Sequence, residues 1–140
     1  MEKTSFTKTD IELIKKACLL CDKSPCDVKS GCLLAKDGQI LTEGCNFLLP
    51  GDCSDHKQCA LHAEAAAVGD AAMRGIALEG STVYVSRFPC EVCTRLLVKS
   101  GVKKVYYMSN HFSGGNAGLP VFEANGVEVV QIPEEVVWGS

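Results

Sequence analysis

The fold of this chain is decided in residues 61–93, which read LHAEAAAVGDAAMRGIALEGSTVYVSRFPCEVC. Leu61 to Met73 is rich in alanine and predicts a helix that stops at Gly75, because glycine commonly terminates helices. Thr82 to Ser86 is a short β-rich run and predicts a strand. Residues 89–99 predict a second helix, since proline is favoured at the first helical position. The stretch is therefore expected to form an α-β-α unit of a sheet covered by helices.

The remaining sequence predicts two more helices and four more strands. In chain order these are a helix from Thr9 or Asp10 to about Asp22, strands at Val28–Ala35, Ile40–Asn46 and Val102–Met108, a helix at Pro120–Ala124 and a strand at Val127–Ile132. Asp37-Gly38 is a tight-turn signal, so the first two strands should form an antiparallel hairpin. The repeated β-α-β order favours parallel pairing of the later strands through right-handed crossovers. We expect one domain over residues 1–140, with a three-layer α/β/α fold.

The composition is that of an ordinary globular protein, with 46% hydrophobic and 22% charged residues. A net charge of -3 argues against nucleic acid as a partner, because proteins that bind duplexes are usually basic. No run of 18 apolar residues is present, so no membrane span is expected. The polar residues 1–5 lack the apolar core of a signal peptide, so we expect a cytoplasmic protein. Nine cysteines in such a chain favour thiols and metal ligation over a disulfide framework.

Two short segments carry the chemistry: His62-Ala63-Glu64 and Pro89-Cys90-Glu91-Val92-Cys93, an H-x-E…P-C-x-x-C pattern. His62, Cys90 and Cys93 are ligand types that zinc prefers, and cysteines three apart at a helix start face the same way. Three protein ligands leave the fourth tetrahedral position open for water, whose pKa zinc lowers to about 7. Glu64 is expected to act as the general acid and base beside that water.

Other interpretations of these residues stay open. The C-x-x-C pair near a strand is also typical of redox motifs. A structural zinc would need a fourth protein ligand, and Cys59, one helical turn before His62, is a candidate. Glu64 discriminates between the two kinds of zinc site, because a purely structural site has no need of an acid/base beside an open position.

The chain resembles the zinc-dependent cytidine and deoxycytidylate deaminase superfamily over about residues 26–132, most closely the dCMP deaminase branch. The matching motifs are Asp37-Gly38, Gly44-Cys45-Asn46, His62-Ala63-Glu64, Phe88-Pro89-Cys90-Glu91-Val92-Cys93, Gly101-Val102 and Gly126-Val127-Glu128-Val129. The resemblance implies a five-stranded mixed sheet in order 2-1-3-4-5, a zinc cofactor and a homo-oligomer, either a dimer or a hexamer. It also implies hydrolytic deamination of a cytosine nucleotide or nucleoside to the uracil form.

The resemblance implies a set of substrate contacts as well. These are Asn46 to the sugar, the backbones of Ala63 and Ser86 to the base edge, Phe88 against the pyrimidine, and Phe112 or His111 closing over it. The alternative for Asn46 is a strand-end asparagine that hydrogen-bonds its own loop, and the alternative for Phe88 is packing in the core. Relatives usually have glycine where this chain has Phe47, which puts the family's phosphate contacts in doubt. The basic residues near the motifs are Lys57, Arg87 and Arg95, each of which could also be a solvated surface charge.

A second, structural zinc is a further expectation from the resemblance. Its candidate ligands are Cys53, His56 and Cys59, with Cys18 or Cys21 as the fourth. The alternative is that Cys18, Cys32 and Cys45 are small buried apolar residues.

Four functions compete at this stage. Deamination of a cytosine nucleotide or nucleoside leads, ahead of a guanine or other free-base deaminase and a tRNA adenosine deaminase, for which this acidic chain lacks a basic face. A zinc-stabilised binding module is the alternative outside enzymes. A small nucleobase, nucleoside or nucleotide is the expected partner, with no membrane contact.

Overall fold

The computed structural model describes residues 6–111 and 114–139 of the chain. The elements in chain order are α1 (Lys8–Leu19), a 3-10 turn (Leu20–Lys23), β1 (Gly31–Lys36), β2 (Gln39–Cys45), α2 (His56–Cys59), α3 (Ala63–Arg74), β3 (Thr82–Arg87), α4 (Glu91–Lys99), β4 (Lys104–Ser109), α5 (Leu119–Ala124), β5 (Glu128–Gln131) and α6 (Glu134–Trp138). In the described ranges, no helix is long and apolar enough to cross a membrane.

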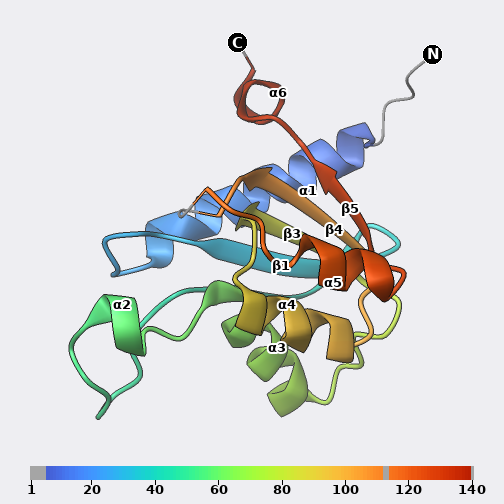
Figure 1. The fold of residues 1–140 in the computed structure, drawn as a ribbon. Helices are drawn as coiled ribbons and strands as arrows, with labels where there is room; N and C mark the ends of the chain where they lie inside the picture. Colours follow the sequence, from blue (N-terminus) through green and yellow to red (C-terminus); the bar gives the residue numbers. More distant parts are fainter. Residues whose placement is uncertain (1–5, 112–113, 140) are drawn as a thin grey trace.

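The strands form one five-stranded sheet in the order β2-β1-β3-β4-β5, which confirms the expected 2-1-3-4-5 order. β1 pairs antiparallel with β2 and β3, whereas β3–β4 and β4–β5 are parallel. Figure 1 shows α1 and α6 on one side of the sheet and α3, α4 and α5 on the other. The three-layer α/β/α prediction is therefore confirmed. Most of the helices and strands that form the layers lie where the sequence patterns predict them.

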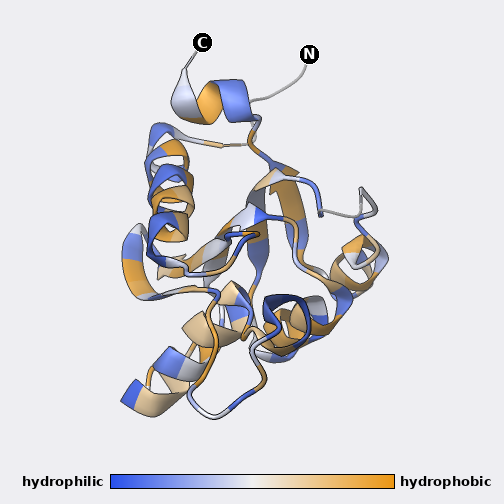
Figure 2. Cartoon of the chain, turned by 90° about the vertical axis from the view of Figure 1, so that its left-hand side faces the viewer, coloured by the Kyte–Doolittle hydropathy of each residue, from blue (hydrophilic) through white to orange (hydrophobic). Residues whose placement is uncertain are grey.

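The start of α1 differs from the prediction of a cap at Thr9 or Asp10. The Thr7 side chain accepts a hydrogen bond from the Asp10 N–H, and the Asp10 carboxylate accepts one from the Thr7 N–H. This reciprocal pair satisfies two of the N–H groups that a helix start leaves free, so the helix begins at Lys8. The alternation of hydrophilic and hydrophobic residues along α1 is visible in Figure 2, and its apolar side packs on the sheet.

The larger differences from the predictions concern β1, α2 and α6. β1 begins at Gly31 rather than Val28, because the Asn46 side chain bonds the backbone of Val28 and Ser30 and holds that segment as a loop. The expected loop over residues 49–57 continues into the single-turn helix α2. Helix α6 was not predicted, since five residues are too few to show a helical period.

Each face of the sheet carries its own hydrophobic cluster. The cluster beneath α3, α4 and α5 includes Phe88 and Phe122, and the cluster beneath α1 and α6 includes Tyr84 and Ile132. Helix α3 lies so close to β2 that a Cβ atom added at Gly44 would come within 2.8 Å of the Ala67 backbone nitrogen. The close approach of β2 and α3 therefore sets the position of the first turn of α3.

Candidate metal centre and its cavity

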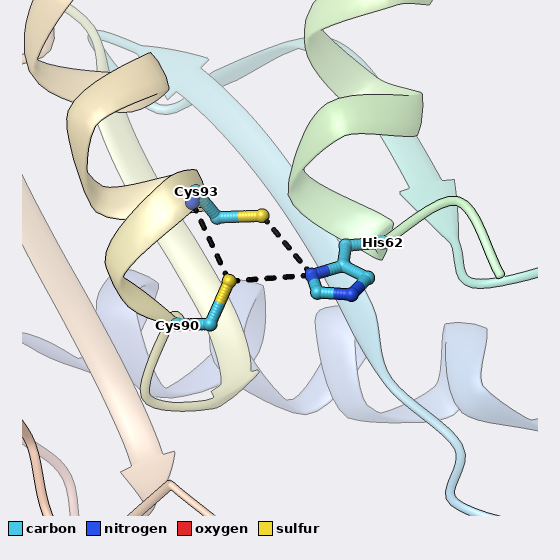
Figure 3. A group of neighbouring side chains, drawn as sticks. All are labelled: His62, Cys90 and Cys93. Carbon is cyan, nitrogen blue, oxygen red and sulfur yellow. Dashed lines mark hydrogen bonds between the residues drawn. The ribbon is translucent and has the colours of Figure 1, made fainter. Parts of the chain in front are cut away.

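Two helix N-termini meet beside the sheet and bring the three predicted metal ligands together. His62 is the N-cap of α3, Cys90 is the N-cap of α4, and Cys93 lies in the first turn of α4. Figure 3 shows the His62 ring directed at both sulfurs. The Nδ1 atom of His62 lies 3.4 Å from the Sγ of Cys90 and 3.3 Å from the Sγ of Cys93.

These distances fit a tetrahedral zinc ion. With bonds of about 2.3 Å to sulfur and about 2.0 Å to nitrogen, ligand atoms in a tetrahedron are separated by about 3.5 Å. The three ligand atoms also all lie within 4.8 Å of one another. No fourth His, Cys, Asp or Glu of the described residues joins this group, as a catalytic zinc site with an open position requires.

The surroundings of Cys90 favour a thiolate. Hydrogen bonds from the Cys93 thiol and the His62 ring, and one from the Cys93 N–H at the helix start, lower the pKa of Cys90 to about 3. The hydrogen bond to Cys90 and burial raise the pKa of Cys93. The hydrogen bond to Cys90 also raises the pKa of His62. The group already holds one negative sulfur, which suits a cation.

Glu64 lies in the first turn of α3 and is only 4% exposed. Burial raises the pKa of its carboxyl to about 7, although its own backbone N–H and His62 partly offset this. A carboxyl with a pKa near neutrality can both accept and return a proton under physiological conditions. Glu64 therefore has the properties of a general acid/base.

A cavity of about 280 Å³ opens beside this centre. Its lining residues come from α3, α4, the end of β3 and the loops around residues 26–30 and 56–60: Cys26, Asp27, Val28, Ser30, Asn46, His56, Lys57, Ala60, His62, Ala63, Glu64, Arg87, Phe88, Cys90 and His111. Glu64 and two of the three predicted metal ligands, His62 and Cys90, thus line the same cavity.

Three of the predicted substrate contacts line the cavity: Asn46, Ala63 and Phe88. The Asn46 Oδ1 atom accepts a hydrogen bond from the Ser30 N–H at 2.9 Å, and its Nδ2 donates to the Val28 carbonyl at 2.7 Å. Asn46 therefore braces the cavity's loop, and each of its polar atoms keeps capacity for one more bond. Phe88 is 2% exposed and packs edge-on against Tyr107 and Phe122, so it serves the core and the cavity together.

The other two predicted substrate contacts are Ser86 and Phe112. The Ser86 side chain turns to the α1 side of the sheet, where its oxygen accepts hydrogen bonds from the Gly31 N–H and the Cys21 thiol. Ser86 is not among the residues that line the cavity. Phe112 lies outside the described residues, whereas the neighbouring His111 lines the cavity. The substrate roles of all these residues stay predictions.

The predicted second zinc site is not assembled. Cys53 and Cys59 form a disulfide with Cα atoms 5.8 Å apart, so their sulfurs are not available as thiolate ligands, although Asp52 lies beside them. The preference for thiols and metal ligation over disulfides was wrong for this pair, because α2 folds residues 53 and 59 back toward each other. Spacing in the sequence does not show such a turn.

The remaining candidates for the second zinc lie apart. The Nδ1 of His56 is 2.9 Å from the Sγ of Cys26, a residue that was not predicted to belong to any site. Cys18 contacts the Met108 sulfur, and Cys21 contacts Ser86. Cys18 and Cys32 are buried as the alternative interpretation expects, whereas Cys45 is partly exposed. No sequence signal distinguishes Cys26 from the other cysteines, because its partner comes from a distant loop.

Comparison with known proteins gives concordant matches. Residues 7–109 match the family model described as "Cytidine and deoxycytidylate deaminase zinc-binding region". The chain is 30% identical over 125 residues to ComE operon protein 2 of Bacillus subtilis, covering 81% of this chain and 66% of that protein. It is 32% identical over 75 residues to deoxycytidylate deaminase of Enterobacteria phage T4, covering 54% of this chain and 39% of that protein. The chain thus spans less than two thirds of the length of these curated relatives.

Among solved structures, the dCMP deaminase of cyanophage S-TIM5 superposes with a TM-score of 0.79 at 30% identity. The superposition covers 91% of this chain and all of that one. The same phage enzyme has been solved in complex with dCMP and dUMP. Since the family match spans most of the chain and includes His62 and Cys90 with Cys93, this chain belongs to the cytidine and deoxycytidylate deaminase family.

Proposed function

We propose that this chain is a zinc-dependent hydrolase that converts cytosine in a nucleotide or nucleoside to uracil and releases ammonia. The observation that carries the proposal is the position of Glu64. A buried carboxyl that lines the same cavity as two of the three clustered ligand residues is what an open, catalytic metal site requires. A structural zinc site or a binding module has no use for that carboxyl.

His62, Cys90 and Cys93 are the residues that would hold the zinc. When bound there, zinc supplies activation of water near neutral pH. Glu64 accepts a proton from the attacking water and passes it to the ring nitrogen next to the amine-bearing carbon. Glu64 then delivers the second water proton to the amine. The carbon gains oxygen, the carbon–nitrogen bond breaks, and ammonia leaves.

The choice of cytosine rests on the relatives. The phage T4 protein is named deoxycytidylate deaminase, and the cyanophage enzyme was crystallised with dCMP and dUMP. The cavity has room for a small ligand, and the acidic chain offers no general attraction to a nucleic acid. The oligomeric state and the cytoplasmic location stay predictions.

An ammonia-release screen tests the proposal. Zinc-loaded protein is incubated with cytosine, cytidine, deoxycytidine, CMP, dCMP, adenine, guanine and their nucleosides. Activity should be confined to cytosine nucleotides or nucleosides, and Glu64→Gln should keep zinc and fold but lose at least about 100-fold in kcat. Activity on guanine alone would identify a free-base deaminase instead. An active Glu64→Gln variant would contradict the assigned role of Glu64.

A further inference from the structure

Lys57, Arg87 and Arg95 are the basic residues near the motifs in the sequence, and the structure places them in different surroundings. Arg87 and Lys57 line the cavity beside the metal centre. Arg95 lies on the outer side of α4, where its guanidinium is 3.5 Å from the Glu91 carboxylate and its side chain is 62% exposed. We propose that Arg87 and Lys57 bind the phosphate of a cytosine mononucleotide, so that the nucleotide and not the nucleoside is the preferred substrate. This inference rests on the proposed function.

Arg87 is held in the cavity wall by the strand that leads to Cys90. It is the last residue of β3, and side chains alternate along a strand, so it lies on the same face as Val83 and Val85, toward α3 and α4. Its Nη1 donates a hydrogen bond of 3.4 Å to the Asn110 carbonyl, which is long for a charged donor.

The Nε of Arg87 is buried and has no hydrogen-bond partner among the described residues. A buried donor without an acceptor costs free energy, and native proteins rarely leave one without a purpose. A guanidinium presents its N–H groups as a fork that matches the oxygens of a phosphate. A phosphate in the cavity would accept hydrogen bonds from the Nη groups of Arg87, whose described bond to the Asn110 carbonyl is long.

Lys57 reaches the cavity from a different element than Arg87. It lies on α2, whose start is fixed by the Asp55 carboxylate accepting the Lys57 N–H at 2.9 Å. No carboxylate in the described part of the chain lies within 4.0 Å of the Lys57 amine. The Lys57 side chain is therefore an exposed cation at the edge of the cavity, with its charge not neutralised by an ion pair.

The charged residues that line the cavity include both basic and acidic side chains. Arg87 and Lys57 are permanent cations, and Asp27 and Glu64 are the acidic residues among the described residues that line the cavity. Glu64 belongs to the metal centre and Asp27 is exposed to solvent. A chain with a net charge of -3 thus has two basic residues, Arg87 and Lys57, among those that line this cavity. A phosphate monoester carries a charge of about −2 near pH 7, so it gains more from this arrangement than a neutral nucleoside.

The test compares kcat/KM for dCMP and deoxycytidine in four zinc-loaded proteins: wild type, Arg87→Gln, Lys57→Gln and the matched control Arg95→Gln. Wild type should prefer dCMP. Arg87→Gln should lower kcat/KM for dCMP by about 10- to 100-fold, the range for a charged hydrogen-bonding group, and should affect deoxycytidine far less. Lys57→Gln should have a smaller effect that fades at high salt, because exposed charges are screened. Arg95→Gln should behave as wild type.

Equal losses for both substrates, or no loss for dCMP, would overturn the proposal. Arg87→Lys serves as a control for a folding defect in Arg87→Gln. Lysine keeps the positive charge but lacks the forked donors of a guanidinium, so this variant should recover part of the activity on dCMP. Calorimetric binding of dUMP and deoxyuridine separates this proposal from the proposed function. If no cytosine compound is deaminated, weaker dUMP binding in Arg87→Gln than in wild type still supports the phosphate site, and equal dUMP binding refutes it.

Discussion

Replacing Gly44 by alanine should damage both stability and activity, because Gly44 marks the closest approach of β2 and α3. The added Cβ would lie 2.8 Å from the Ala67 nitrogen, 2.9 Å from the Ala63 oxygen and 2.9 Å from the Ala66 Cβ. Ordinary contact begins at 3.4 Å, so the first turn of α3 must retreat by about 0.6 Å. None of the three atoms is the end of a flexible side chain, so the strain has no easy release.

The expected magnitude follows from that retreat. Overpacking of this kind typically costs about 1–3 kcal/mol, which lowers the Tm of a domain of this size by roughly 4–12 °C. The same turn carries His62 and Glu64, and a misplacement of about 1 Å can cost about 100-fold in rate. We therefore expect activity on dCMP to fall about tenfold or more.

Gly69→Ala is the matched control, since Gly69 lies in the same helix and, apart from the helix's own backbone and its chain neighbours, no heavy atom of the described residues lies within 4 Å of an added Cβ. Alanine should stabilise α3 there by about 1 kcal/mol and leave activity unchanged. Thermal and urea unfolding monitored by circular dichroism, together with ammonia release, measure both effects. A Gly44→Ala protein as stable and as active as wild type would show that the β2–α3 contact relaxes freely, and would refute the argument.

Three further outcomes are expected. Removing zinc with a chelator should abolish ammonia release and lower the Tm, and added Zn²⁺ should restore both. Metal analysis that finds no zinc in active protein would contradict a catalytic zinc. Asp10→Asn should destabilise by about 1–2 kcal/mol. Burial opposes ionisation of Asp10, but hydrogen bonds from Tyr84 and Thr7 outweigh burial and lower the pKa of Asp10 below 3.8. The stability that ionised Asp10 adds is therefore present above about pH 4 and is lost as the pH falls further. An Asp10→Asn destabilisation that persists at pH 2 would contradict this. Asn46→Ala should raise KM for dCMP more than for free cytosine, and equal increases would mean that Asn46 only braces Val28 and Ser30.

Much of the metal centre could be predicted from residue identity and spacing. His62 and Glu64 lie at the start of an alanine-rich helix, and Cys90 with Cys93 lies at the start of the next one, so local rules of helix initiation already put the four side chains at helix starts. The sheet order and the three layers followed from the resemblance and from the β-α-β pattern. The helix starts depend on interactions within a few residues, which a sequence displays directly, whereas the sheet order was implied by the resemblance.

Loops and distant contacts could not be predicted in the same way. The disulfide between Cys53 and Cys59, the pairing of His56 with Cys26 and the late start of β1 depend on how the loops around residues 24–30 and 46–61 fold. Those loops lack periodicity, so nothing in the sequence singled out the pairing of Cys53 with Cys59.

The types and spacing of the residues were enough to indicate a zinc centre with an acid/base, because ligand chemistry and helix starts are local properties. Only the tertiary structure decided which cations face the cavity. Arg87 and Arg95 are the same residue type eight positions apart, yet one ends a strand and points into the cavity while the other lies on the outer side of a helix. Strand alternation, the β3–α4 connection and the packing of α4 on the sheet separate them, and those are properties of the assembled fold.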